Sequence, residues 1–176
     1  LDVLVNNASA ISLTGTEATD VKRYDLMNSI NARGTFVASK FAVPHLRKSA
    51  NPHVLTLSPP LDMNPKWFAP HVAYTLAKYG MSVMTLGMAR EFAPDGIAFN
   101  SLWPLTAIDT AAVRNVIGGD SMAALSRKPE IMADAAHAIL TKPAREVTGN
   151  FFIDEEVLRA EGVTDFSVYA HAPGGE

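Results

Sequence analysis

Short apolar segments alternate with long helical segments along most of this chain. The apolar segments have the length of strands, and they lie at Leu1–Asn6, His53–Ser58, Ile97–Leu102 and Asn150–Ile153. Between them, apolar residues at helical spacing predict helices over about 20–47 and 71–92 and helical stretches up to residue 140. Short, uniformly apolar strands are typical of parallel sheets that helices cover on both faces. The pattern therefore predicts an α/β fold with a doubly wound parallel sheet.

Turn residues mark where several of these elements begin. Thr19-Asp20 can cap the first helix, and Asn51-Pro52 and Pro94-Asp95-Gly96 predict turns into the next strands. The chain starts on an apolar strand and without a methionine, so we expect that the first part of its domain is missing. Residues 1–176 are then the C-terminal part of a single domain, and residues 168–176 form a surface ending.

Composition favours a small-molecule partner. The 176 residues are 48% hydrophobic and 19% charged, and 15 basic against 18 acidic residues give a net charge of −3. The sequence has no long run of basic or acidic residues, so its charge gives no argument for binding to nucleic acid or to an anionic membrane. No apolar run approaches the roughly 18 residues of a membrane helix. The chain has no cysteine, which excludes disulfides and agrees with a reducing compartment, so we expect a cytoplasmic protein.

Metal chemistry and hydrolysis find little support in the sequence. The five histidines show no spacing typical of a metal site, and we expect no metal. A hydrolase built from Ser58, His71 and Asp62 is conceivable, but the sequence has no Gly-x-Ser-x-Gly element.

Polar and turn residues follow three of the predicted strands. Asn6 and Ser58 each close a strand, and Pro104 follows the third. Ligands of open parallel sheets bind outside the carboxyl ends of the strands. We therefore expect one ligand site at this edge of the sheet.

Tyr74 and Lys78 are four residues apart in a predicted helix, which places a phenol and an ammonium group on one face. A phenol has an ordinary pKa of about 10, and a nearby cation lowers it because it favours the phenolate. Tyr74 is therefore a candidate acid and base, and the Ser58 hydroxyl could donate to an oxyanion beside it. An exposed helix pair and a serine bonded to its own turn are the structural alternatives.

In chain order, Asn6-Asn7-Ala8-Ser9, Asn31, Ser58, Tyr74 with Lys78, and Pro104-Leu105-Thr106 resemble the short-chain dehydrogenase/reductase family. Leu57-Ser58-Pro59-Pro60, Trp67-Phe68 and Leu102-Trp103-Pro104 look most like its hydroxysteroid dehydrogenase-like subgroup. The resemblance covers nearly the whole chain. It implies a Rossmann-like fold and an oxidoreductase that interconverts a carbonyl and an alcohol with NAD or NADP. Steroid specificity does not follow from it.

The resemblance also implies roles for single residues. Lys78 would hold the cofactor ribose, and Asn31 would bind water at a helix kink and complete a proton relay. Asn6, Asn7 and Ala8 would stabilise the central strand and face the adenosine half of the cofactor. Pro104, Thr106 and Ile108 would line the nicotinamide. Two family glycines are replaced, by Ser9 and Leu105, and the family serine could align with Ser58 or with Pro59.

Three further expectations remain open between alternatives. Met63, Trp67, Phe68, Ile117 and Met122 either line a small hydrophobic substrate or form core beneath loops. The helices that carry Asn31 and Tyr74 present apolar faces like those of the family's dimers, so we expect a homodimer or homotetramer. The chain has no Gly-rich phosphate turn, and its rival interpretation is a non-catalytic fragment or pseudo-enzyme that serves as a binding domain.

Overall fold

The computed structural model describes residues 1–171, apart from the side chains of residues 116 and 117. The chain forms two compact units. Unit 1 contains Leu1–Leu102 and Lys142–Phe151, and unit 2 contains Trp103–Thr141 and Phe152–Glu176. The Ile117 side chain and the last part of the predicted surface ending, residues 172–176, lie outside the described residues. That the whole chain is part of one domain stays a prediction.

A four-stranded sheet is the central element of the fold, in the order β1-β2-β3-β4. Its strands are β1 (Val3–Asn6), β2 (His53–Thr56), β3 (Ala98–Trp103) and β4 (Phe151–Ile153). β1, β2 and β3 are parallel, and Asn6, Thr56 and Ser101 lie in register at their carboxyl ends. The predicted strands and the Rossmann-like α/β class are confirmed.

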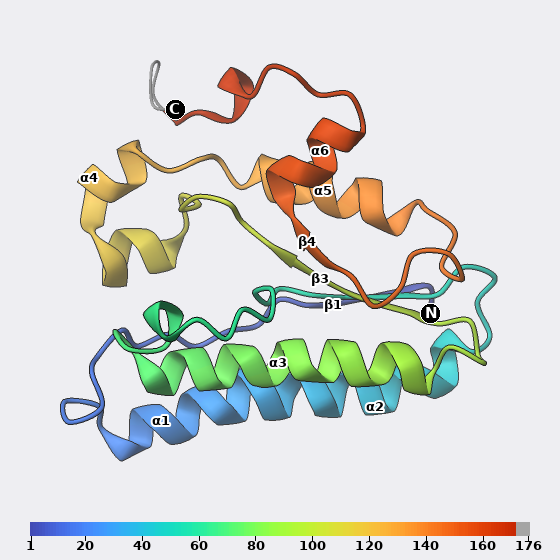
Figure 1. Ribbon diagram of the computed structural model, residues 1–176, viewed down its shortest axis with the longest axis horizontal. Helices are drawn as coiled ribbons and strands as arrows, with labels where there is room; N and C mark the ends of the chain where they lie inside the picture. The colour runs from blue at the N-terminus through green and yellow to red at the C-terminus, as the bar shows by residue number, and fades with distance from the viewer. Residues whose placement is uncertain (172–176) are drawn as a thin grey trace. The chain divides into compact units, whose positions relative to one another are not determined.

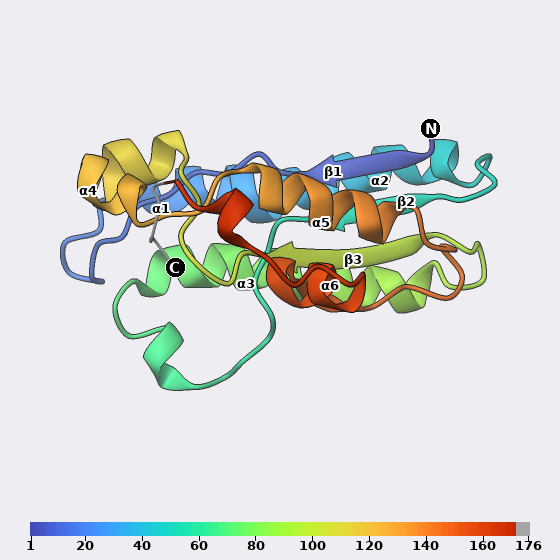
Figure 2. The ribbon, with the colours of Figure 1, turned by 90° about the horizontal axis from the view of Figure 1, so that it is seen from above.

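Two long helical segments lie on one side of β1, β2 and β3 (Figures 1 and 2). The first consists of α1 (Val21–Met27), the π-helical η1 (Asn28–Arg33) and α2 (Gly34–Leu46). The second is α3 (Val72–Glu91). The Asp20 side chain caps α1 by accepting a hydrogen bond of 2.8 Å from the Lys22 N–H, as predicted. The wide connection from β2 to α3 contains η2 (Pro65–Trp67) (Figure 2).

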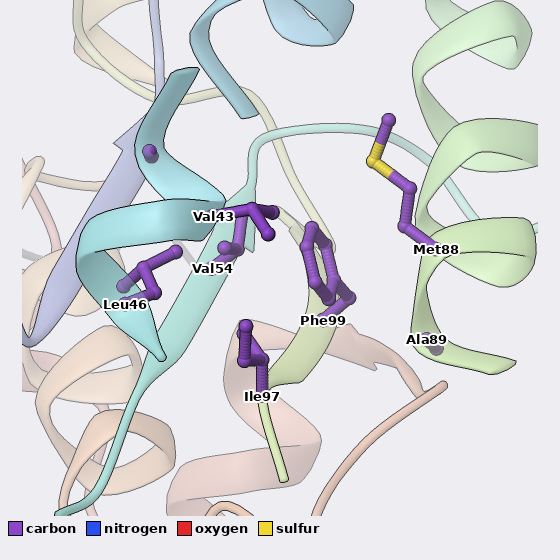
Figure 3. Close-up of a cluster of buried hydrophobic side chains, with 8 residues drawn as sticks. Val43, Leu46, Val54, Met88, Ala89, Ile97 and Phe99 are labelled. Atoms are coloured by element: carbon purple, nitrogen blue, oxygen red, sulfur yellow. The ribbon is translucent and has the colours of Figure 1, made fainter. Parts of the chain in front are cut away.

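The hydrophobic core of unit 1 joins these helices to the sheet (Figure 3). Val43 of α2 and Val54 of β2 point towards Phe99 of β3, and Met88 reaches the cluster from α3. Phe92 stacks on Phe99 with ring centroids 5.6 Å apart. Such close packing fixes the helices against the strands, and so fixes the residues at the strand ends.

Unit 2 contains mostly short helices. They are η3 (Val113–Ile117), α4 (Gly119–Ala124), α5 (Glu130–Leu140), α6 (Asp154–Ala160) and η4 (Ser167–Tyr169). The predicted helical stretches up to Leu140 are confirmed by α4 and α5, whereas α6 was not predicted. Isolated bridges pair Arg127 with Ile108 and with Ala170.

Among the described residues, no helix is both long and apolar enough to cross a membrane. The same residues contain no cluster of three or more histidine or acidic side chains that could hold a metal ion.

Candidate active site

Tyr74 and Lys78 lie one turn apart near the start of α3. The Tyr74 ring is partly buried against Met27, Ala73 and Ala77, and its centroid is 5.9 Å from that of His71. Within the described part of the chain, the Tyr74 hydroxyl makes no hydrogen bond. Lys78 is 5% exposed, and its Nζ donates to the Leu57 carbonyl at 2.8 Å. Lys78 thus joins α3 to the backbone that follows β2.

Burial controls the ionisation of both groups. It raises the pKa of Tyr74 to about 12, because the phenolate would be poorly solvated. It lowers the pKa of Lys78 to about 8 for the same reason applied to the ammonium. The expectation that Lys78 lowers the phenol pKa stays a prediction, because desolvation is what raises the pKa of Tyr74 here and the Lys78 Nζ donates to the Leu57 carbonyl.

Asn31 lies in the π-helical segment η1 and is fully buried. Its Oδ1 accepts from the Ala10 N–H at 2.8 Å, and its Nδ2 donates to the Ala10 carbonyl at 2.9 Å. Both polar ends of the amide are therefore satisfied by the segment that follows β1. π-helical turns interrupt the regular helix and are frequent at functional sites. The role of Asn31 in a water relay stays a prediction.

Asn6 and its two successors have different environments. Asn6 is buried, and its Nδ2 donates to Ser39 Oγ at 3.2 Å and Thr56 Oγ1 at 3.4 Å. Its carbonyl accepts from the Leu57 N–H at 3.0 Å. Asn7 and Ala8 are exposed. Asn6 therefore stabilises β1 against its neighbours, and the next two residues are exposed.

The Ser58 hydroxyl is in the core of unit 1. Ser58 is fully buried, and its Oγ shares a hydrogen bond of 2.9 Å with Ser101 Oγ, which in turn donates to Thr85 Oγ1 at 2.9 Å. The Pro59 carbonyl accepts from Ser82 Oγ at 2.6 Å. Committed to this buried chain of hydroxyls, Ser58 is poorly placed to donate to a ligand. Its oxyanion role stays a prediction that this environment disfavours.

Side chains of α3 also hold the connection between β2 and α3. Thr75 Oγ1 donates to the Trp67 carbonyl at 2.9 Å, and the Tyr79 hydroxyl donates to the Asp62 carbonyl at 2.6 Å. Phe68 packs on the Tyr79 ring with centroids 4.8 Å apart. Met63 and Trp67 remain exposed. Phe68 therefore contributes to packing, whereas Met63 and Trp67 present apolar surface on a connection anchored beside Tyr74.

The bend at residues 104–106 belongs to unit 2. Thr106 is exposed, whereas Ile108 is 8% exposed. The Leu105 N–H donates to Asp154 Oδ1 at 2.9 Å. Pro104 is partly buried. The bend thus leaves Thr106 exposed to solvent.

Two residues that sequence reasoning missed support the candidate site residues. Ala10 holds Asn31 through its backbone, and no property of an alanine side chain could have indicated this. Asp154 directly follows β4 and is fully buried. Its place after a predicted strand was a usable signal, because the same rule selected Asn6, Ser58 and Pro104.

Comparison with known proteins places the chain in a family. The family model described as enoyl-(acyl carrier protein) reductase matches residues 1–153. The chain belongs to the short-chain dehydrogenase/reductase family, a family of oxidoreductases. It is 58% identical over 174 residues to hydroxysteroid dehydrogenase-like protein 2 of Danio rerio, with 99% of this chain and 41% of that protein aligned. The chain thus spans less than half the length of that relative.

Solved structures agree with this family. A short-chain dehydrogenase from Mycobacterium thermoresistibile is 52% identical, with a TM-score of 0.90 over 99% of this chain and 61% of that chain. An angucycline C-6 ketoreductase solved with bound NADP is 23% identical, with a TM-score of 0.73 over 88% and 61% of the two chains. A 4-hydroxyisoleucine dehydrogenase complexed with NADH is 21% identical, with a TM-score of 0.68 over 86% and 66%. The last two likenesses concern the fold alone.

Proposed function

We propose that this chain carries the catalytic part of an NAD- or NADP-dependent oxidoreductase that interconverts a carbonyl and an alcohol. The observation that carries the proposal is the placement of Tyr74 and Lys78 on one turn of α3. The Tyr74 hydroxyl has no hydrogen-bond partner within the described residues, and Lys78 reaches the carboxyl end of β2. A proton donor with no competing acceptor, at the edge where ligands of parallel sheets bind, suits carbonyl reduction.

Each unit offers polar groups that suit part of a nicotinamide dinucleotide. In unit 1 the Lys78 amine and the Tyr74 hydroxyl are donors that suit ribose hydroxyls. In unit 2 the exposed residue Thr106 carries a donor that suits a carboxamide. The exposed residues Asn7 and Ala8 suit the adenosine half. When bound, the dinucleotide supplies the hydride. The NADP and NADH of the two fold relatives support either form, and no observation selects between them.

The chain's own residues would manage the proton. With a pKa of about 12, Tyr74 is protonated at neutral pH and can act as the acid in the direction of reduction. Lys78, with a pKa of about 8, is mostly protonated at neutral pH and can stabilise the phenolate that proton transfer leaves behind. In the direction of oxidation Tyr74 would act as the base, so its pKa would have to fall when the site is filled.

The exposed apolar side chains of Met63 and Trp67 favour a small hydrophobic substrate. They lie on the connection whose Trp67 carbonyl is bonded to Thr75, the residue after Tyr74. A substrate body held there would be near the phenol.

Replacement of Tyr74 by phenylalanine tests the proposal. Because only the hydroxyl is removed, Tyr74→Phe should lower the rate of NADH- or NADPH-dependent reduction of hydrophobic aldehydes and ketones at least about a hundredfold. Its cofactor affinity, measured by fluorescence titration, should stay near that of the parent chain. Tyr24→Phe on α1, an exposed tyrosine, is the matched control and should keep full activity. Retained turnover in Tyr74→Phe would refute the role of the phenol.

A non-catalytic binding domain is the second candidate function. The raised pKa of Tyr74 favours it, since very little of a phenol with that pKa is deprotonated and able to act as a base at neutral pH. The cofactor titration separates the two candidates. Saturable binding together with turnover supports the oxidoreductase, and binding without turnover on any tested carbonyl supports the binding domain.

A further inference from the structure

Asp154, the first residue of α6, is a fully buried carboxylate in unit 2. Its Oδ1 accepts two backbone N–H groups, from Leu105 at 2.9 Å and from Glu155 at 2.7 Å. Its Oδ2 is buried and has no hydrogen-bond partner within the residues that the structure describes. A buried carboxylate oxygen left unsatisfied costs free energy, which the two hydrogen bonds to Oδ1 oppose.

The bond to Leu105 fixes one side of Thr106. The other side is fixed through Arg127, whose N–H donates to the Ala107 carbonyl at 2.9 Å and whose carbonyl accepts from the Asp109 N–H at 2.8 Å. Thr106 itself is exposed. Its hydroxyl is therefore presented on a bend whose flanking peptide groups are both held.

Glu155 holds the second anchor. It is 8% exposed and pairs with the Arg127 guanidinium and, through Oε1, with Arg159 Nε at 3.0 Å and Nη2 at 2.7 Å. The guanidinium groups of Arg127 and Arg159 also lie over the Phe166 ring, at 5.4 Å and 4.7 Å from its centroid. The dipeptide Asp154-Glu155 thus reaches the bend directly at Leu105 and indirectly through Arg127.

We infer that Asp154 is a positioning residue that fixes the bend at residues 104–106, so that Thr106 is preorganised for the nicotinamide half of the cofactor. The inference rests on the proposed function and deepens it. Asp154 touches no reacting atom in this scheme. It acts by restricting the backbone before the cofactor binds, which lowers the entropic cost of ordering the bend on binding.

Three variants separate this role from plain stability. Asp154→Ala removes the acceptor of the Leu105 N–H, whereas Asp154→Asn keeps a side-chain oxygen that can accept it. Leu158→Ala is the matched control. Leu158 is also buried on α6, but its side chain cannot accept a hydrogen bond from the bend. Amide hydrogen exchange of the full chain, read at Leu105, reports the anchor without any cofactor. NADH and NADPH titrations and the split between KM and kcat report its consequence.

Asp154→Ala should accelerate exchange at Leu105 and weaken cofactor binding about tenfold or more, since a hydrogen bond to a charged group is lost. KM for the cofactor should rise with little change in kcat. Asp154→Asn should restore both readouts to near the parent values, and Leu158→Ala should lower the melting temperature without changing either. If Asp154→Ala does not fold, Glu155→Gln should show faster exchange at Asp109 and a smaller loss of affinity in the same direction.

Unchanged exchange at Leu105 in Asp154→Ala would overturn the inference, whatever the cofactor does. Faster exchange with unchanged cofactor affinity would also overturn it, because the bend would then not matter for binding. If the parent chain binds neither NADH nor NADPH, the proposed function fails and the link to the cofactor fails with it. Faster exchange in Asp154→Ala would in that case still establish the anchor, so the two failures are distinguishable.

Discussion

At the scale of single residues, the Ser58 hydroxyl is buried in the core, where it is bonded to Ser101 and is not accessible to a ligand. The chain of hydrogen bonds from Ser58 through Ser101 to Thr85 joins the end of β2 to β3 and α3. Buried hydroxyls need such partners, since burial of an unbonded one is costly. Ser58 therefore contributes first to stability.

Ser58→Ala tests this assignment. It should lower the free energy of unfolding by about 1 kcal/mol, because Ser101 keeps its bond to Thr85 and only one hydrogen bond is lost. Chemical denaturation measures this loss, and kcat should change by less than about threefold if no transition-state contact is removed. Ser121→Ala, at an exposed position, is the control and should change neither value. A large fall in kcat at unchanged stability would instead support the oxyanion role.

Lys78, unlike Ser58, carries a buried charge that opposes folding. Its folded pKa of about 8 lies below the ordinary lysine pKa of 10.5, so the unfolded chain binds more protons between these two values. Stability should therefore rise as pH increases through this window, and the buried ammonium should oppose folding below it.

Lys78→Met should remove the contribution of Lys78 to this pH dependence. Between about pH 8 and 10.5, the increase in unfolding free energy seen in the parent chain should be smaller in the variant. Below pH 8 the variant should be at least as stable as the parent, although it should bind NADH and NADPH more weakly and reduce carbonyls more slowly. Denaturation curves at several pH values measure the first effect, and titration measures the second. Identical pH profiles for both chains would contradict the shifted pKa of Lys78.

At the scale of elements, the π-helical segment η1 is joined to the segment after β1 through Asn31. Both polar atoms of that side chain, Oδ1 and Nδ2, are hydrogen-bonded to the Ala10 backbone. The side chain of Asn28, three residues earlier, donates to the Tyr24 carbonyl of its own helix at 3.0 Å and makes no other hydrogen bond within the described residues. One asparagine therefore connects two elements, and the other serves its helix alone.

Asn31→Ala should cost about 1–3 kcal/mol, because two partly buried backbone groups of Ala10 lose their partners. Amide exchange at Ala10 should accelerate, and exchange in β2 should follow global stability only. Asn28→Ala, three residues earlier in η1, should leave the Ala10 amide protected. Equal protection of Ala10 in both variants would show that Asn31 does not hold this segment.

Sequence patterns could predict the strands and helices better than they could predict which way a side chain such as Ser58 points. The apolar strands ending near Asn6 and Ser58 were identifiable because a parallel sheet buries both faces of a strand. That same double burial hides the direction of Ser58, since alternation no longer separates an inner from an outer face. The apolar spacing over 20–47 also predicts a helix without distinguishing the π-helical η1 inside it. Asn31 was therefore placed in a helix, but its bonds to Ala10 were not predictable.

Ionisation could not be read from spacing either. The four-residue separation of Tyr74 and Lys78 correctly places them on one turn of α3. It contains no information on how much water reaches the two groups, and burial decides both pKa values. Similarly, α6 was missed because only seven residues form it, too few for helical periodicity to appear.

At the scale of the whole molecule, α2 and α3 leave large apolar side chains exposed. Phe36 and Phe41 are exposed on α2, and Leu76, Val83 and Leu86 are exposed on α3. The α3 residues are spaced by seven and three positions, so they share one face of the helix. Exposed apolar surface of this kind marks interaction sites. We propose that a second copy of the chain covers it, in a homodimer or homotetramer.

Charged substitutions on this face should therefore break the oligomer. The parent chain should sediment as a dimer or tetramer, and Phe41→Glu and Leu86→Glu should sediment as monomers, because burial of a carboxylate at an apolar interface is costly. Leu125→Glu is the matched control, since Leu125 is 73% exposed in unit 2, and it should keep the parent's oligomeric state. Because Leu86 lies on the same helix as Tyr74 and Lys78, loss of the interface should also lower kcat/KM in Leu86→Glu. A monomeric parent chain at micromolar concentration would contradict the proposed homo-oligomer.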